Sequence, residues 1–378
     1  MRVAIVHDWL TVYSGAERVL EQMIQIYPDC DVFSTVDFIP KKQRDFLKGK
    51  STNVTFIQSL PFAKKFYRSY LPLMPLAIEQ LDLSRYDLII SSSHAVAKGV
   101  ISGPDQLHIC MCYSPMRYAW DLKFQYLNSN SKKISLKRLL QAYFLHRLKQ
   151  WDFISSQGVD QFIAISRFIN RRIQKCYRRD SVVIYPPVKL LNLKLIEKSE
   201  RRDYFITHSR FVPYKKIDLI IEAFNNYLPN EKLKIIGSGP EESKLKKLAN
   251  DNIEFLGFVN DEVLTDELSH AKGYIFAAEE DFGIAPLEAQ GLGTPVIAYG
   301  KGGSLETIGD FAGEGKCGIL FYEHTAISLA AAVKEFIATI DEFTPQACRN
   351  NANRFSEKNF QNKFKTYIDK KINLSITS

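Results

Sequence analysis

The sequence lacks any apolar run of the roughly 18 to 20 residues that a helix needs to cross a bilayer. Its apolar start ends early at His7 and Asp8, so we expect no secretory signal peptide. Six cysteines at irregular positions in 378 residues form neither a disulfide framework nor the paired spacing of a zinc site. Repeats and low-complexity segments are missing as well. These absences predict a reduced, cytoplasmic, globular protein.

Acidic residues are scarce in the first half of the chain. Residues 1–190 carry 27 Lys/Arg and 15 Asp/Glu, a net charge of +12, whereas residues 191–378 carry 23 and 27, a net charge of −4. A basic first half indicates an anionic partner for it. Hydrophobic residues make up 46% of the chain, which is ordinary for a soluble protein, and 378 residues are enough for two domains.

A G-x-G-x-x-G sequence is missing after the first strand, which counts against a dinucleotide-binding dehydrogenase. What the first half does contain is a series of short apolar stretches with helical patterns between them, near residues 2–6, 31–36, 53–57, 87–91, 108–112 and 161–165. This alternation predicts a doubly wound α/β domain. Pro186 and Pro187 then follow a last strand and mark the expected domain boundary.

The stretch 273–306 carries the clearest functional signal. An apolar strand at 274–277 is followed by an acidic loop and by a short helix, which we expect to begin at Pro286 with Glu288 in its first turn. Ligands of parallel sheets bind outside the carboxyl ends of the strands. Glu280 and Glu288 should therefore lie at that edge, with free backbone N–H groups between them. Carboxylates suit sugar hydroxyls and a helix start suits a pyrophosphate, which favours a sugar nucleotide.

Other residues at expected strand ends extend this site. Arg210 and Lys215 flank the turn before a helix at 216–228, and two cations there suit a diphosphate. Gly237 and Gly239 form a turn that we expect to pass close to the nucleotide. Gly15 begins the first helix of the chain, where an anion site is favoured. His94 follows the strand at 87–90 and should face the crevice of the first domain.

The sequence E-D-F-G-I-A-P-L-E, from Glu280 to Glu288, resembles the E-x7-E signature of retaining glycosyltransferases of the family 4 type. The resemblance implies the GT-B fold, an α/β fold of two Rossmann-like, doubly wound domains facing across a cleft. Residues 1–186 would form the acceptor-binding domain, with a C-terminal helix near 357–378 packing back on it. Residues 187–356 would form the nucleotide-sugar-binding domain.

The resemblance also implies roles for individual residues. Glu280 would contact the donor sugar and Glu288 its ribose, while Arg210 and Lys215 would bind the diphosphate without a metal ion. The implied catalytic residues are Glu280, His94, Arg210 and Lys215. The implied donor-binding residues are Gly15, Gly237, Gly239, Phe258, Phe282, Gly283, Ile284, Ala285 and Glu288.

The stretches V-H-D-W-L and S-H-A-V-A-K-G-V are similar to those of GDP-mannose-dependent mannosyltransferases of bacterial O-antigen or capsule assembly. They imply transfer of mannose to a polyprenyl-diphosphate-linked oligosaccharide at the inner face of the plasma membrane. A UDP-hexose-dependent enzyme of the same fold is the alternative. A metal-dependent GT-A enzyme would need the single D-x-D, Asp29-Cys30-Asp31. A nucleic-acid-binding protein is suggested only by the basic charge, and no such module is present, so we expect no nucleic-acid partner.

Two basic and aromatic segments, 62–70 and 131–150, predict peripheral binding to an anionic membrane surface. The second is helical in pattern, with Arg147 intruding on its apolar stripe. A solvated helix over the core is the competing interpretation. The residues expected to share its apolar face are Leu136, Leu140, Tyr143, Phe144 and Trp151.

Overall fold

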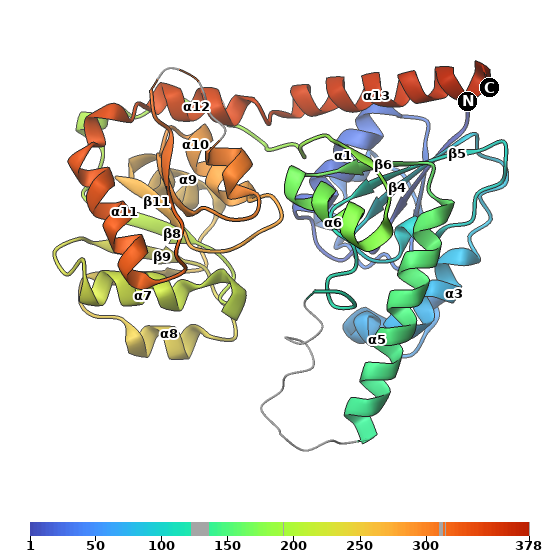
Figure 1. The fold of residues 1–378 in the computed structure, drawn as a ribbon, viewed down its shortest axis with the longest axis horizontal. Helices are drawn as coiled ribbons and strands as arrows, with labels where there is room; N and C mark the ends of the chain where they lie inside the picture. Colours follow the sequence, from blue (N-terminus) through green and yellow to red (C-terminus); the bar gives the residue numbers. More distant parts are fainter. Residues whose placement is uncertain (122–135, 192, 310–312, 314, 378) are drawn as a thin grey trace. The chain divides into compact units, whose positions relative to one another are not determined.

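The computed structural model describes residues 1–121, 136–191, 193–309, 313 and 315–377 (Figure 1). The chain forms two compact units. Unit 1 comprises Met1–Pro187 with Lys358–Ser378, and unit 2 comprises Val188–Glu357. The expected boundaries lay one residue earlier, after 186 and after 356. Each unit contains one parallel sheet with helices, as the alternating pattern predicted.

Unit 1 is built on a seven-stranded sheet in the order β3-β2-β1-β4-β5-β6-β7. Its strand order reverses between β1 and β4, both of which are completely buried, as expected for central strands covered on both faces. The strands are β1 (Val3–His7), β2 (Asp31–Ser34), β3 (Thr52–Val54), β4 (Leu88–Ser93), β5 (Leu107–Cys112), β6 (Gln161–Ala164) and β7 (Ser181–Val183). The helices are α1 (Gly15–Ile26), α2 (Ala63–Phe66), α3 (Met74–Glu79), α5 (Leu136–Ser155), α6 (Arg167–Tyr177) and α13 (Glu357–Thr377).

Unit 2 is built on a six-stranded parallel sheet in the order β10-β9-β8-β11-β12-β13, which is the classic Rossmann order with its reversal between β8 and β11. The strands are β8 (Phe205–His208), β9 (Leu233–Ile236), β10 (Ile253–Gly257), β11 (Gly273–Phe276), β12 (Val296–Tyr299) and β13 (Gly318–Phe321). The helices are α7 (Ile217–Asn226), α8 (Glu242–Leu248), α9 (Asp261–His270), α10 (Ile284–Gly291), α11 (Ala326–Ala338) and α12 (Pro345–Asn353).

Successive residues of the central strands of unit 2 contribute to different cores. Phe205 and Ile275 pack with α7 and α11 on one face of the sheet. Ile206 and Tyr274 pack with α9 and α10 on the other. Side chains of a strand alternate between faces, so a strand covered on both sides must be apolar at every position. This explains the continuous apolar runs that identified these strands in the sequence.

Helix α10 begins earlier than predicted. It starts at Ile284, so Pro286 is its third residue rather than its first, and Glu288 lies beyond the first turn. Gly283 precedes the helix with φ +93°, a left-handed conformation that turns the chain into the helix two residues sooner. Pro286 is tolerated there because the N–H groups of a first helical turn have no acceptor within the helix.

The C-terminal helix α13 belongs to unit 1. The Gln361 amide donates a hydrogen bond of 2.6 Å to the Gln22 side chain on α1, and the Tyr367 hydroxyl lies 3.1 Å from the Gln161 side-chain oxygen on β6. These contacts fasten the end of the chain to its first 187 residues. Among the described residues, no helix is long and apolar enough to cross a membrane.

A buried ion pair joins two elements on one side of the unit 1 sheet. The Lys98 ammonium contacts the Asp152 carboxylate, and both side chains are almost fully buried. Asp152 also accepts hydrogen bonds from Trp120 Nε1 (2.7 Å) and the Tyr177 hydroxyl (2.9 Å). Burial alone would lower the pKa of Lys98, but Asp152 outweighs it and raises that pKa. The cluster is therefore structural, and Trp120 belongs to it.

We predict that Lys98→Met lowers the free energy of unfolding of unit 1 by about 3 to 5 kcal/mol, because it leaves the Asp152 carboxylate buried without its cation. Adding Asp152→Asn should recover a large part of the loss. All three tryptophans lie in unit 1, so their fluorescence during urea unfolding reports this unit. The exposed Lys365–Asp369 pair on α13 provides the control, since Lys365→Met should cost less than about 1 kcal/mol. Equal effects of the two substitutions would contradict the prediction.

Candidate functional site

A lysine and a glutamate meet where the strand order of unit 2 reverses. Lys215 ends the turn that follows β8, and Glu280 lies in the loop between β11 and α10. The Lys215 ammonium forms an ion pair with Glu280 Oε1, and both side chains are about one-fifth exposed. Loops after the two strands at a reversal leave an opening at the carboxyl edge, which is where ligands of such sheets bind. The pair therefore lies at the expected ligand edge.

The backbone at Glu280 is fixed by the two glycines that follow β12. Glu280 forms a parallel bridge with Gly302, and Gly303 donates an N–H···O bond of 2.8 Å to the Glu280 carbonyl. Gly302 has φ +73°, and a Cβ at either glycine would overlap the backbone of the 280–282 loop. Only glycine allows this close approach. The side chain of Glu280 thus extends from a backbone that is held in place.

His208, at the end of β8, is a site residue that the sequence analysis missed. Its Nε2 atom lies 4.0 Å from Glu288 Oε2, and its ring packs against Tyr274 with 5.4 Å between centroids. Burial, followed by the nearby Lys215 cation, lowers the pKa of His208 to about 4. The imidazole is therefore neutral at neutral pH. It stands directly before the Ser209-Arg210 turn, a position that could have identified it.

The glycine turn after β9 packs against the turn that carries Arg210. The Gly237 N–H donates to the Gly257 carbonyl (2.8 Å), and this amide is therefore not free for a phosphate. Gly237 has φ +133°, and side chains at Gly237 or Gly239 would overlap the backbone of residues 209–211. These glycines let two strand-end loops pack closely. They position Arg210, whose side chain is exposed, beside the opening.

The start of α10 supplies backbone donors rather than side chains. Ile284 and Ala285 are its first two residues, and Gly283 precedes them, so their N–H groups have no acceptor within the helix. The Phe282 ring is buried against Phe355, with centroids 5.5 Å apart, and is a core residue. Phe258, after β10, is the opposite case, because 86% of its side chain is exposed.

A second acid and base meet where the strand order of unit 1 reverses. Asp8 follows β1 and is completely buried, and His94 follows β4. The Asp8 carboxylate lies 2.9 Å from His94 Nδ1. It also accepts four backbone N–H bonds of 2.6 to 3.0 Å, from His94, Ala95, Val96 and Ala97. One carboxylate therefore holds both the loop and the imidazole.

The charges of this pair follow from its contacts. Burial alone would raise the pKa of Asp8, but His94 and the backbone donors outweigh it and hold that pKa well below its usual range. Burial alone would lower the pKa of His94, but Asp8 outweighs it and raises that pKa. About a third of the His94 side chain is exposed. The raised pKa favours the charged form of His94, in which both ring nitrogens donate hydrogen bonds.

The start of α1 is already occupied by a carboxylate. Glu17 accepts hydrogen bonds from the Ser14 backbone (3.0 Å) and hydroxyl (2.8 Å), completing a capping box around Gly15. Glu17 Oε1 also lies 3.5 Å from His7 Nε2. A buried anion at this helix start opposes a second anion. The anion site predicted at Gly15 is therefore less favourable than the sequence suggested.

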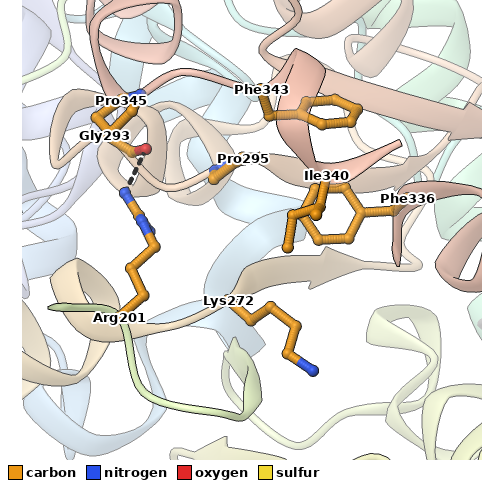
Figure 2. Close-up of a pocket in the computed structure, with 8 residues that line it drawn as sticks. All are labelled: Arg201, Lys272, Gly293, Pro295, Phe336, Ile340, Phe343 and Pro345. Atoms are coloured by element: carbon orange, nitrogen blue, oxygen red, sulfur yellow. Dashed lines mark hydrogen bonds between the residues drawn. The ribbon is translucent and has the colours of Figure 1, made fainter. Parts of the chain in front are cut away.

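A small cavity lies at the amino ends of β11 and β12, away from the ligand edge (Figure 2). Its volume is about 20 Å³, and it is lined by two cations and several apolar side chains. Arg201 donates to the Gly293 carbonyl (2.7 Å), and Lys272 lies 2.8 Å from Glu231. Both cations are already paired, so the cavity offers no free charge to a ligand.

The described residues contain no group of three or more His, Cys, Asp or Glu placed to hold a metal ion. In the D-x-D sequence, the Asp31 carboxylate accepts a hydrogen bond of 2.6 Å from the Tyr86 hydroxyl and lies 3.3 Å from Arg85. Asp31 is the first residue of β2, at the amino edge of the sheet. The D-x-D therefore lies at the opposite end of the strand from the carboxyl edge, where ligands are expected.

Sequence comparisons place the clearest similarity in unit 2. Residues 192–355 match the family model described as Glycosyl transferases group 1. The uncharacterized glycosyltransferase YqgM of Bacillus subtilis is 28% identical over 222 residues, which are 56% of this chain and 58% of YqgM. A GDP-mannose-dependent monoacylated alpha-(1-6)-phosphatidylinositol monomannoside mannosyltransferase of Corynebacterium glutamicum is 37% identical over 115 residues, 27% of this chain and 30% of that protein. The matches thus span less than two thirds of these relatives' lengths.

Structural comparisons extend over the whole chain. Sucrose-phosphate synthase of Thermosynechococcus elongatus has a TM-score of 0.69 at 16% identity, covering 99% of each chain. HepE of Anabaena, solved with UDP and glucose, has a TM-score of 0.65 at 18% identity, covering 97% of this chain and 99% of that one. Identities this low show a shared fold. The chain therefore has the two Rossmann-like domains of the GT-B fold, with a segment in unit 2 that matches the group 1 glycosyl transferases.

Proposed function

We propose that the protein is a retaining glycosyltransferase that transfers a hexose from a nucleoside-diphosphate sugar. The observation that carries the proposal is the Lys215–Glu280 pair at the strand-order reversal of unit 2, inside the segment that matches the group 1 model. A cation suited to a diphosphate and a carboxylate suited to sugar hydroxyls are in direct contact there. Side chains suited to the two parts of a sugar nucleotide thus lie next to each other.

The contacts suggest how the donor would be bound. A diphosphate would draw Lys215 from Glu280 and also attract the exposed Arg210, while the free Glu280 carboxylate would accept hydrogen bonds from the sugar. The N–H groups of Ile284 and Ala285 at the start of α10 would add donors to the phosphate. Glu288 would accept from the ribose. Negative charge that develops on the departing diphosphate would then be stabilised by side chains and backbone amides.

For the donor we favour GDP-mannose, which makes the enzyme an alpha-mannosyltransferase. Support comes from the V-H-D-W-L stretch and from relatives that are GDP-mannose-dependent by name, including the Corynebacterium protein. A UDP-hexose donor is the second candidate, favoured by the structural neighbour solved with UDP and glucose. A panel of purified donors, measured as release of nucleoside diphosphate, separates the two.

For the acceptor we favour a polyprenyl-diphosphate-linked oligosaccharide of bacterial surface polysaccharide synthesis. The basic charge of residues 1–190 suits a diphosphate-bearing acceptor at an anionic membrane. The enzyme would then act in the cytoplasm, bound peripherally to the inner face of the plasma membrane. Enzymatic transfer to extracted lipid-linked glycans, followed by mass spectrometry, tests this assignment.

We predict that Glu280→Gln lowers turnover by about two to four orders of magnitude, since the lost contact is made to the reacting sugar. Initial rates at saturating donor measure the effect. Glu279→Gln is the matched control, because Glu279 is the neighbouring residue and pairs with the exposed Lys301 at 3.2 Å. Near-wild-type turnover of Glu280→Gln would refute the assignment of Glu280.

The double substitution Arg210→Ala with Lys215→Ala should nearly abolish transfer, whereas EDTA should leave the wild-type rate unchanged. Both expectations follow from side chains, rather than a metal ion, stabilising the leaving diphosphate. Lys216→Asn is the control, because Lys216 adopts φ +57°, which asparagine tolerates. Full inhibition by EDTA that manganese reverses would favour the metal-dependent alternative.

Asp8 should keep His94 charged above the usual pH range of a histidine. Because the pKa of folded His94 is raised, we expect activity to fall as the pH rises through that pKa. Asp8→Asn removes the anion, so the pKa of His94 and the alkaline limit of activity should both move to lower pH. Glu17 and Arg68 are the other charged groups that act on the His94 ring. Histidine NMR of folded protein measures the pKa directly. A wild-type His94 pKa at or below 6.5 would contradict the prediction.

A further inference from the structure

Phe62 holds an apolar ring out in water at a conformational cost. It has φ +55° and ψ +17°, in the left-handed region that side chains rarely adopt, and 78% of it is exposed. Backbone strain persists only where surrounding structure enforces it, and it concentrates at functional positions. The Phe62 carbonyl accepts from the N–H groups of Lys65 and Phe66 at the start of α2, so the backbone is held while the ring is left accessible to a partner outside unit 1.

More apolar side chains around Phe62 are exposed in the same way. Phe66, Leu73 and Leu76 are each between 42% and 52% exposed, on α2, α3 and the turn between them. The cations that accompany them are also exposed, at Lys64, Lys65 and Arg68. Between these residues, Ala63, Tyr67, Met74 and Ala77 are buried in the core of unit 1 and fix the backbone. The exposed side chains therefore cannot turn inward.

Helix α5 presents a second exposed apolar stripe on the same unit. Its members follow helical spacing and are 42% to 74% exposed: Leu136, Leu139, Leu140, Tyr143 and Phe144. The predicted face also included Trp151, but that residue is half-buried, and its Nε1 donates to Glu79 on α3 at 2.5 Å. Leu145 of α5 and Tyr70 and Leu71 pack against one core. The two exposed surfaces are thus anchored side by side (Figure 1).

The net charge of residues 1–190 lies in these two regions. Residues 46–78 contain five Lys/Arg and residues 122–151 contain seven, and neither stretch contains an acid. The rest of 1–190 holds 15 Lys/Arg and 15 Asp/Glu, which cancel. Exposed apolar side chains therefore occur in the same stretches of sequence as the excess of Lys and Arg, which is the combination that an anionic bilayer surface binds.

We propose that this aromatic-basic surface, formed by Phe62, Phe66, Leu73 and Leu76 with Lys64, Lys65 and Arg68 and continued by the α5 stripe, docks unit 1 on an anionic lipid bilayer. Docking would bring the enzyme to a lipid-linked acceptor, and this role rests on the proposed function. The rings enter the boundary between headgroups and acyl chains while the cations contact lipid phosphates. Two other partners fit this surface less well. A second copy of the chain would place cations against cations, and a nucleic acid offers no apolar region for the exposed leucines.

Co-sedimentation with phosphatidylcholine vesicles, with and without phosphatidylglycerol, tests the surface. We expect binding to the anionic vesicles only, weakened by salt. Replacing Lys64, Lys65 and Arg68 together by Ser should weaken binding by about a hundredfold, since each cation near anionic lipid contributes about fivefold. Ile101→Ser is the matched control in the same unit, because that side chain is 64% exposed and residues 99–103 contain no Lys or Arg. Equal binding to neutral and anionic vesicles, or none at low salt, overturns the proposal.

Phe62→Gly separates docking from folding. Glycine adopts φ +55° without strain, so the urea midpoint of the tryptophan signal should stay equal or rise while vesicle binding falls. Vesicle binding that is unchanged in this variant overturns the role of Phe62. Vesicle binding needs no sugar donor, and GDP or UDP binding measured by calorimetry needs no vesicle. A failure of the proposed transfer activity is therefore distinguishable from a failure of docking.

Discussion

The reversal of strand order in each sheet is the constraint on which both candidate sites depend. Where neighbouring parallel strands send their loops to opposite faces, the carboxyl edge stays open, and side chains from distant parts of the sequence can meet there. In unit 2 the reversal brings Lys215 to Glu280, and in unit 1 it brings Asp8 to His94. Each pair joins an acid and a base from two different strand ends. The sheets therefore determine where the chemistry is located, and the loops determine what that chemistry is.

Three charged pairs in the protein differ in burial, and the difference separates their roles. Lys98 and Asp152 are both buried and fully satisfied, so they organise the core and are inaccessible to a ligand. Asp8 is buried, but its partner His94 is partly exposed, so a ligand can contact the imidazole and not the carboxylate. Lys215 and Glu280 are both partly exposed, and a ligand with opposite charges can exchange with each of them. Burial decreases across this series as accessibility to a ligand increases.

Much of the fold could be predicted from the sequence because parallel strands covered on both faces are continuously apolar. The strand ends, and with them the edge positions of Glu280, His94 and Lys215, followed from that pattern. The start of α10 could not be predicted, since Pro286 is compatible with several positions in a first turn and the left-handed Gly283 decides among them. The core role of Phe282 was hidden too, because its partner Phe355 is more than seventy residues away.

Pairing explains most of what the sequence could not reveal about the sites. The sequence shows that Asp8 and Glu17 are carboxylates but not which groups they contact. Asp8 already binds four backbone N–H groups and the His94 ring, and Glu17 already caps the start of α1. The same limit applies to the basic first half, because the sequence gives the position of the excess charge but not the exposure of the side chains near it. Once the 15 acids are set against 15 of the cations, the excess is confined to 46–78 and 122–151. Those stretches include the exposed rings of Phe62 and Tyr143, which no residue of the core covers. Excess positive charge in the same stretches as exposed apolar side chains supports the proposed docking on a bilayer, because an anionic surface with an apolar interior matches both properties.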